Sequence, residues 1–164
     1  MRATTPAPGN ALETGGPWLH ARYMDPLHVG CPACGATNRI PAARLTDDPN
    51  CGRCHLPLLT GEPVTLTEAS FDGVAARTDL PLIVDFWAGW CGPCRSMAPQ
   101  FEQAARTLKG RAILVKVDSD ANPALAARFA IRSLPTLLKL QRGKETSRLA
   151  GARPARDIIQ FAGA

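Results

Sequence analysis

The chain has 164 residues, 45% of them hydrophobic and 20% charged, and a formal net charge of +5, which is the composition of a soluble protein. The longest apolar stretch, residues 80–88, is interrupted by Pro81 and Asp85, and no apolar run opens the chain, so we expect neither a transmembrane helix nor a secretory signal. The excess positive charge is spread over residues 63–164 and aromatic residues make up only 5%, which argues against a nucleic-acid partner.

The first two segments of the chain contain little material for a hydrophobic core. Residues 1–27 are rich in Pro, Gly, Ala and Thr and show neither strand nor helix periodicity, so we expect a flexible tail. Residues 28–61 have few large aliphatic side chains, too few to fold unaided. This second segment therefore needs another source of folding energy.

Four cysteines in residues 28–61 have the spacing C-x2-C-x16-C-x2-C, which is typical of a zinc site. Two residues between cysteines allow a tight turn to direct both sulfurs at one point, and Gly35 and Gly52 ease the backbone there. Four thiolates complete a tetrahedron with no open position, so we predict a structural zinc ion whose binding stabilises the module. A rubredoxin-like iron site and a pair of disulfides are the alternatives, and His55 is expected to be a surface histidine. The predicted ligands are Cys31, Cys34, Cys51 and Cys54.

Residues 62–164 alternate between strand and helix patterns. A strand–helix–strand half followed by a strand–strand–helix half predicts an α/β domain with a mixed sheet, its first two long strands parallel and its last two antiparallel. The predicted elements in chain order are a helix at 70–77 capped by Ser70, a buried strand at 82–87, a helix at 93–108, a second strand at 112–117, a helix from Asn122 and Pro123 to about 129, strands at 136–140 and 147–150 joined by a turn at Arg142–Gly143, and a last helix from Pro154 with Ile158, Ile159 and Phe161 facing inward.

The third cysteine pair, Cys91 and Cys94, stands between a buried strand and the start of a helix. Free N–H groups and the helix dipole at such a position favour a thiolate. We expect Cys91 to be the exposed nucleophile and Cys94, one turn into the helix, to be more buried and to resolve the mixed disulfide. Pro93 fits the first helical position, where its missing N–H costs nothing.

Residues 85–94, with the sequence DFWAGWCGPC, resemble the active-site signature of thioredoxins. The resemblance extends from about residue 62 to the C-terminus and includes Lys116, residues 131–136 and Gly151. With the four-cysteine module in front, the whole chain resembles the thioredoxin-2 type, which has an N-terminal zinc ribbon. The resemblance implies a thioredoxin fold over residues 62–164, preceded by a zinc-ribbon module at 28–61.

The resemblance also implies a role for individual residues. Cys91 attacks the target disulfide, Cys94 resolves the intermediate, and Asp85 accepts the proton of Cys94 with Lys116 as its partner; a surface position on an edge strand is the alternative for Asp85. Pro135 corresponds to a cis-proline that leaves the backbone of the preceding residue free for a substrate strand, the alternative being a trans turn proline. Trp87 is equally compatible with the core and with target contact. The expected substrate-binding residues are Trp90, Gly92, Pro93, Leu134, Gly151 and Ala152.

The function that the resemblance implies is reduction of protein disulfides in the cytoplasm, by a monomer with a redox-active disulfide. No glycine-rich nucleotide motif is present, so an NADPH-dependent flavin reductase is the expected electron donor and disulfide-containing proteins are the expected targets. Gly89 and Arg95 depart from the residues common in the family and could tune partner choice. Two other functions stay open. The chain could be a zinc-dependent module that only docks partners, or the ribbon could sense oxidation by releasing its metal in addition to the reductase activity.

Overall fold

A computed structural model describes residues 25–163 of the chain. The predicted tail at 1–27 therefore falls almost wholly outside the described residues. None of the helices within the described range has the length and apolar character that crossing a bilayer requires.

The centre of the molecule is a mixed five-stranded sheet with strand order β3-β5-β4-β6-β7. β4 lies in the middle, parallel to β5 and antiparallel to β6, as the predicted α/β topology requires. The edge strand β3 pairs in parallel with β5 and was not predicted, because its two residues are too few to show a pattern. The strands are β3 (Val64–Thr65), β4 (Leu82–Trp87), β5 (Ile113–Asp118), β6 (Thr136–Gln141) and β7 (Lys144–Ala150).

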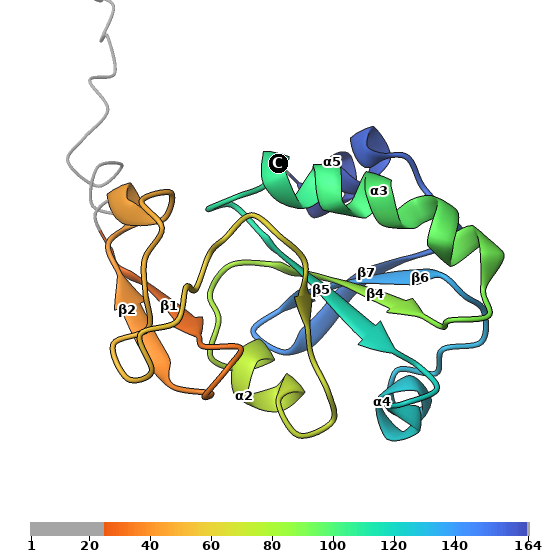
Figure 1. The fold of residues 1–164 in the computed structure, drawn as a ribbon, viewed down its shortest axis with the longest axis horizontal. Coiled ribbons are helices and arrows are strands. Elements are labelled where there is room, and N and C mark those ends of the chain that lie inside the picture. Colours follow the sequence, from red (N-terminus) through yellow and green to blue (C-terminus); the bar gives the residue numbers. More distant parts are fainter. Residues whose placement is uncertain (1–24, 164) are drawn as a thin grey trace, which may run out of the picture.

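Helices cover both faces of this sheet (Figure 1). The long helix α3 and the C-terminal α5 lie together on one face, and α2 and α4 lie on the other. Alternation along β4 divides the core accordingly: Val84 and Phe86 join the apolar cluster on the α2 side, whereas Ile83 joins the cluster beneath α3 and α5. The helices are α2 (Phe71–Ala75), α3 (Gly92–Thr107), α4 (Pro123–Arg128) and α5 (Ala155–Ala162).

The cysteine-rich segment forms a small separate hairpin beside α2. β1 (Leu27–Gly30) pairs antiparallel with β2 (Thr37–Ile40), and a short 3-10 turn, Ala42–Arg44, follows. Figure 1 places this ribbon at the end of the sheet away from the start of α3. Its buried side chains continue directly into the apolar cluster on the α2 side of the sheet: Val29, Ile40, Leu45, Leu58 and Leu59.

Polar and backbone contacts also fix the ribbon to the sheet domain. The Gly30 N–H donates to the buried Thr78 hydroxyl at 3.0 Å, and the Asp79 N–H donates to the His28 carbonyl at 2.9 Å. A Cβ at Gly30 would lie 2.9 Å from the backbone of Gly73 and Val74, so only glycine allows β1 to approach α2 this closely. The ribbon is thus packed against α2 at close range.

Most local predictions for residues 62–164 are confirmed, and the differences have simple causes. The turn at Arg142–Gly143 has positive φ at both residues, as a tight hairpin needs, but β7 begins three residues earlier than expected, at Lys144. Ser70 and Asn122 stand at the N-cap positions of α2 and α4, yet neither side chain caps its helix. The Asn122 carboxamide instead binds the backbone of Glu68 and Asp118.

The last helix buries a narrower face than expected. Ile158 is fully buried, whereas Ile159 and Phe161 are only partly buried and pack against the cluster beneath α3 and α5.

Candidate active site and metal centre

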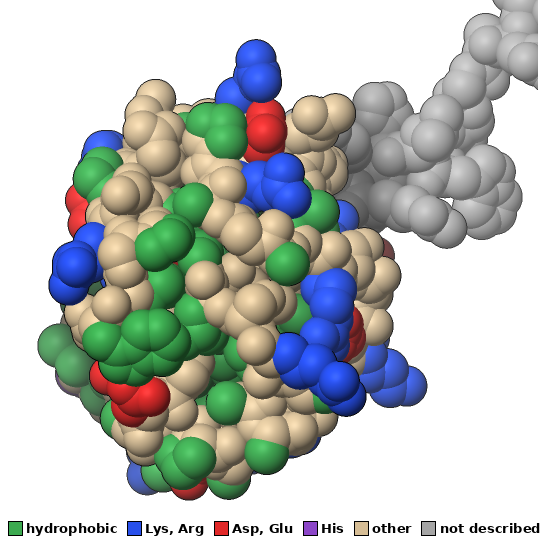
Figure 2. Space-filling model, turned by 90° about the vertical axis from the view of Figure 1, so that its right-hand side faces the viewer, with side chains coloured by type: hydrophobic (Ala, Val, Ile, Leu, Met, Phe, Trp, Pro, Cys, Tyr) green, Lys and Arg blue, Asp and Glu red, His purple; other side chains and the backbone are tan. Residues whose placement is uncertain are grey.

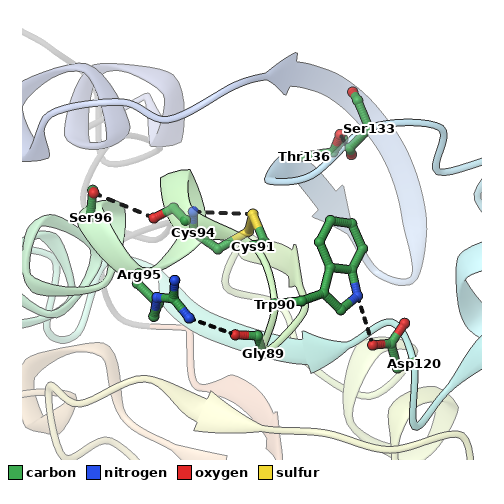
Figure 3. The surroundings of a disulfide bond; sticks show 10 residues. Gly89, Trp90, Cys91, Cys94, Arg95, Ser96, Asp120, Ser133 and Thr136 are labelled. Carbon is green, nitrogen blue, oxygen red and sulfur yellow. Dashed lines mark hydrogen bonds between the residues drawn. A yellow bond between two sulfur atoms is a disulfide. The ribbon is translucent and has the colours of Figure 1, made fainter.

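The active-site cysteines lie where β4 leaves the sheet and α3 begins. Cys91 occupies the N-cap position of α3, and its sulfur accepts a hydrogen bond from the Cys94 N–H at 3.2 Å (Figure 3). The two cysteines form a disulfide, and Pro93 stands in the first turn, as expected. A sulfur that accepts a backbone N–H at a helix start is stabilised as a thiolate once the disulfide is reduced.

Cys91 and Cys94 are buried to the same extent. The prediction that Cys91 is exposed and Cys94 more buried is therefore wrong for this oxidised state. Each is only 4% exposed. They form a small apolar cluster with Ala88, against which Trp87 and Leu134 pack. Because Trp87 and Leu134 cover the cluster, the position of Cys91 at the start of the helix does not make it accessible in this oxidised state.

Trp90 projects from the loop before Cys91 and is 70% exposed. Its indole N–H donates to Asp120 at 2.9 Å, which orients the ring beside the disulfide (Figure 3). Asp120 is not among the residues predicted from the sequence. The topology offers the relevant signal, because Asp120 follows β5, and the carboxyl ends of the parallel strands β4 and β5 meet at one edge of the sheet.

Asp85 lies in the middle of β4 and is 1% exposed, so the alternative of an edge-strand surface position is wrong. Burial raises the pKa of Asp85 to about 7, against the opposing effect of the Lys116 charge. Lys116 is its register partner on β5, and the Lys116 ammonium lies over the Trp87 ring, 4.8 Å from the ring centre. One carboxyl oxygen of Asp85 has no hydrogen-bond partner among the described residues. Asp85 is therefore poised to hold or release a proton near neutral pH.

The Leu134–Pro135 peptide bond is cis and immediately precedes β6. Gly151, with φ of 87°, donates its N–H to the Pro135 carbonyl at 2.9 Å, which joins the end of β7 to this loop. Neither the N–H nor the carbonyl of Leu134 has a backbone or side-chain partner within residues 25–163.

The other predicted binding residues surround the disulfide. Gly92 and Pro93 begin α3, and Ala152 lines a groove with Ser96 and Met97 of that helix. Trp87 is half-buried beneath the loop, with its indole nitrogen buried and unpartnered among the described residues, so it contributes more to packing than to the exposed face.

The four cysteines of the ribbon converge on one point, with all their sulfurs within 4.8 Å of one another. The Cys31–Cys54 and Cys34–Cys51 sulfur pairs are 3.6 and 3.7 Å apart. Four thiolates about 2.3 Å from a central ion would be separated by about 3.8 Å, so the donor set fits a tetrahedral metal. His55 is exposed and not part of the cluster, as expected.

The surroundings of the sulfurs tune their protonation in opposite directions. Hydrogen bonds from the backbone N–H groups of Cys54 and Arg53 lower the pKa of Cys51 to about 6, whereas burial raises the pKa of Cys31 to about 12. The side-chain NH2 of Asn38 donates to the Cys51 sulfur. The side-chain oxygen of Asn38 accepts a hydrogen bond from the Gly52 N–H at 2.9 Å. These donors support negatively charged sulfur, which a divalent cation would favour further.

Comparison with known proteins assigns both parts of the chain. The family model described as thioredoxin matches residues 62–164, and the model described as thioredoxin 2, N-terminal, a zinc ribbon, matches residues 30–55. The chain belongs to the thioredoxin family. Thioredoxins are protein-disulfide oxidoreductases, and the chain is a thiol–disulfide reductase of this family with a zinc-ribbon domain in front.

Individual thioredoxins agree with this assignment. Thioredoxin C-3 of Corynebacterium nephridii is 43% identical over 133 residues, which span 81% of this chain and 91% of the relative. The thioredoxin of Haemophilus influenzae is 37% identical over 100 residues, or 61% of this chain and 94% of the relative. Among solved structures, chloroplastic thioredoxin z is similar with a TM-score of 0.58 at 36% identity, covering 62% of this chain and 92% of that one.

Proposed function

We propose that the chain reduces protein disulfides through Cys91 and Cys94, with Asp85 as the proton acceptor. The observation that carries the assignment of roles is the Cys91–Cys94 disulfide at the start of α3, together with a buried carboxyl in the preceding strand β4 whose pKa is raised to about 7. A buried acid that titrates near neutral pH can accept a proton from a neighbouring thiol during turnover.

The reaction would proceed in two exchanges that conserve electrons. The Cys91 thiolate attacks one sulfur of the target disulfide, a mixed disulfide forms, and the first target sulfur leaves as a thiolate. Asp85 then takes the proton of Cys94, whose sulfur attacks that of Cys91. The Cys91–Cys94 disulfide forms, the second target sulfur leaves, and the target has gained two electrons.

The apolar rim of the site would hold the target during these steps. Trp90 is held by Asp120, and the unpartnered backbone groups of Leu134 offer hydrogen bonds to an extended target segment. Gly92, Pro93, Gly151 and Ala152 keep the approach free of large side chains. Lys116 would moderate the charge of Asp85.

Thioredoxins exchange electrons with a reductase and with disulfide-containing targets. We infer that this chain, acting as a cytoplasmic monomer, is recharged by an NADPH-dependent flavin reductase. Mixed with such a reductase and NADPH, the reduced protein should reduce insulin with NADPH oxidised in a one-to-one ratio to disulfides cleaved. Insulin reduction driven by dithiothreitol but not by any NADPH-dependent reductase would contradict this donor and leave the exchange chemistry intact.

The metal that the ribbon would hold is zinc, because four thiolates at tetrahedral spacing with no open position suit a structural zinc site. Cys31, Cys34, Cys51 and Cys54 would be its ligands. Zinc at this site would contribute folding energy and no chemistry. Because the buried side chains of the ribbon and of residues 62–164 form one cluster, we propose that the module at 28–61 and the thioredoxin domain at 62–164 unfold together.

Removing the metal should destabilise the whole chain but spare the redox reaction. Chelation of the reduced protein is expected to lower the melting temperature by about 10 °C or more, because the ribbon loses the source of its folding energy. Below the new transition, insulin reduction should persist, since the ribbon lies at the other end of the sheet (Figure 1). Cys34→Ser should reproduce the loss of stability, whereas His55→Ala, beside the cluster, should not. An unchanged melting temperature in protein verified as metal-free would refute the structural role.

A further inference from the structure

Three arginines without ion-pair partners stand around the disulfide: Arg95, Arg132 and Arg153. Within residues 25–163, no carboxylate oxygen lies within 4.0 Å of their side-chain nitrogens. In contrast, Arg128 pairs with Asp72 at 2.7 Å. Arg39, Arg53, Arg77 and Arg111 also have no ion pair among the described residues, so what distinguishes Arg95, Arg132 and Arg153 is their position on the segments that adjoin the disulfide.

Arg95 is fixed closest to the reacting sulfurs. It lies in the first turn of α3, next to Cys94, and its guanidinium donates to the Gly89 carbonyl at 3.0 Å (Figure 3). This bond holds the charged group beside the loop that presents Trp90 and Cys91. A guanidinium has five N–H donors, so most of those of Arg95 face solvent and are available to a ligand.

Arg153 stands on the opposite side of the approach, just beyond Ala152. It lines the groove that Ser96, Met97 and Gln100 of α3 form against the loop 152–154. One terminal nitrogen of its guanidinium donates to the Ala150 carbonyl at 3.0 Å, whereas its Nε is buried and has no partner among the described residues. An unpaired, partly buried guanidinium favours an incoming anion over solvent alone.

The third arginine, Arg132, lies in the loop before the cis-proline. It is exposed and lies two residues before Leu134, which packs directly against the disulfide cluster. No carboxylate of the described residues pairs directly with these three guanidinium groups. Asp120 accepts the neutral Trp90 indole N–H and keeps its negative charge, and Asp157, which lines a second groove beside Arg153, lies 3.2 Å from Arg156.

Figure 2 shows this end of the molecule as an apolar centre with Lys and Arg side chains on several sides and a few Asp and Glu side chains among them. We propose that this face selects target disulfides flanked by acidic residues, with Arg95, Arg132 and Arg153 as the specificity-determining side chains. The proposal rests on the proposed function, whose apolar rim would hold the target while the arginines bind its carboxylates. Complementary charge raises the rate of encounter and is screened by salt.

The test compares three disulfide-linked peptides that differ only in the residues flanking the cysteines: acidic, neutral or basic. For the wild-type protein at about 20 mM salt, we expect kcat/KM to be about tenfold higher for the acidic than for the basic peptide, falling to about twofold at about 500 mM salt. Equal rates for the two charged peptides at low salt would overturn the proposal. If none of the three peptides, including the neutral one, is reduced, the proposed function itself fails.

Substitutions distinguish the effect of these three arginines on peptide preference from the effect of the overall charge of the chain. In the triple variant Arg95→Gln, Arg132→Gln, Arg153→Gln, the kcat/KM for the acidic peptide should be at most about twofold higher than that for the basic peptide. Arg111→Gln removes an exposed charge just beyond the far end of α3, where its guanidinium donates to the Thr107 carbonyl, and should keep the full ratio. Because each ratio is measured within one variant, a change in the folded fraction cancels. An unchanged ratio in the triple variant, or an equal loss in Arg111→Gln, would assign the preference to net charge and refute the proposal.

Discussion

Cys91→Ser should lose insulin reduction by about a thousandfold or more, to the level of the thiol donor alone, because a serine hydroxyl at this site is not ionised and cannot open a disulfide. The Cys91 sulfur is the one that accepts the N–H at the start of α3, so it is the thiolate that the local structure stabilises. The measurement is insulin reduction with dithiothreitol as the donor, at equal concentrations of each variant.

Cys94→Ser should also lose turnover, but for a different reason. Cys91 can still attack, and without a resolving thiol the mixed disulfide accumulates, so target proteins should remain covalently attached until a reductant is added. The Cys91→Ser, Cys94→Ser double variant is the matched control and should capture nothing. Capture by Cys91→Ser in place of Cys94→Ser would reverse the two roles, and equal capture by both would mean that either sulfur can attack.

Asp85→Asn should stabilise the oxidised protein by about 3 kcal/mol near about pH 8 and by less than about 1 kcal/mol near about pH 4. In the folded chain, burial holds the Asp85 pKa at about 7, above its ordinary value of 3.8. Between these two values the unfolded chain releases its proton and the folded chain keeps it, so the folded state loses stability as the pH rises. Above about pH 7 the full cost is present, because the carboxylate must be charged while it is buried and unpaired.

The measurement is chemical unfolding of both proteins across this pH range. The wild-type free energy of unfolding should decline from about pH 4 to about pH 7 by roughly 3 kcal/mol more than that of the variant. The variant should also turn over insulin more slowly, by about tenfold or more, since Cys94 loses its proton acceptor. Parallel stability profiles for the two proteins would show that Asp85 titrates normally and would remove it from the mechanism.

Much of the fold could be predicted because its signals are local. The apolar run at 82–87 matches β4 at both ends, and the helix predicted at 93–108 matches α3 within one residue. The cysteine spacing likewise indicates a shared ion, and the sulfurs do converge. In each case neighbouring residues along the chain contain the information, through side-chain periodicity or through the reach of a tight turn.

Features that depend on distant parts of the chain were missed or mistaken. Asp120 reaches Trp90 only because two parallel strands end at the same edge of the sheet. The equal burial of Cys91 and Cys94 arises from packing against Leu134, which lies about forty residues further along. The edge strand β3 exists because β5 offers it a partner, and its two residues carry no pattern of their own.

The sequence by itself determined that six cysteines divide into four for a metal and two for exchange, since spacing and neighbouring residues decide which sulfurs can meet. Only the tertiary structure decided where the two groups lie. It places the ribbon against α2, with a shared core and away from the disulfide, because Gly30 and Thr78 allow close contact there. It also gathers three arginines from separate loops and a helix around the active site. Burial and charge at a surface depend on which segments meet in space, and no local pattern contains that information.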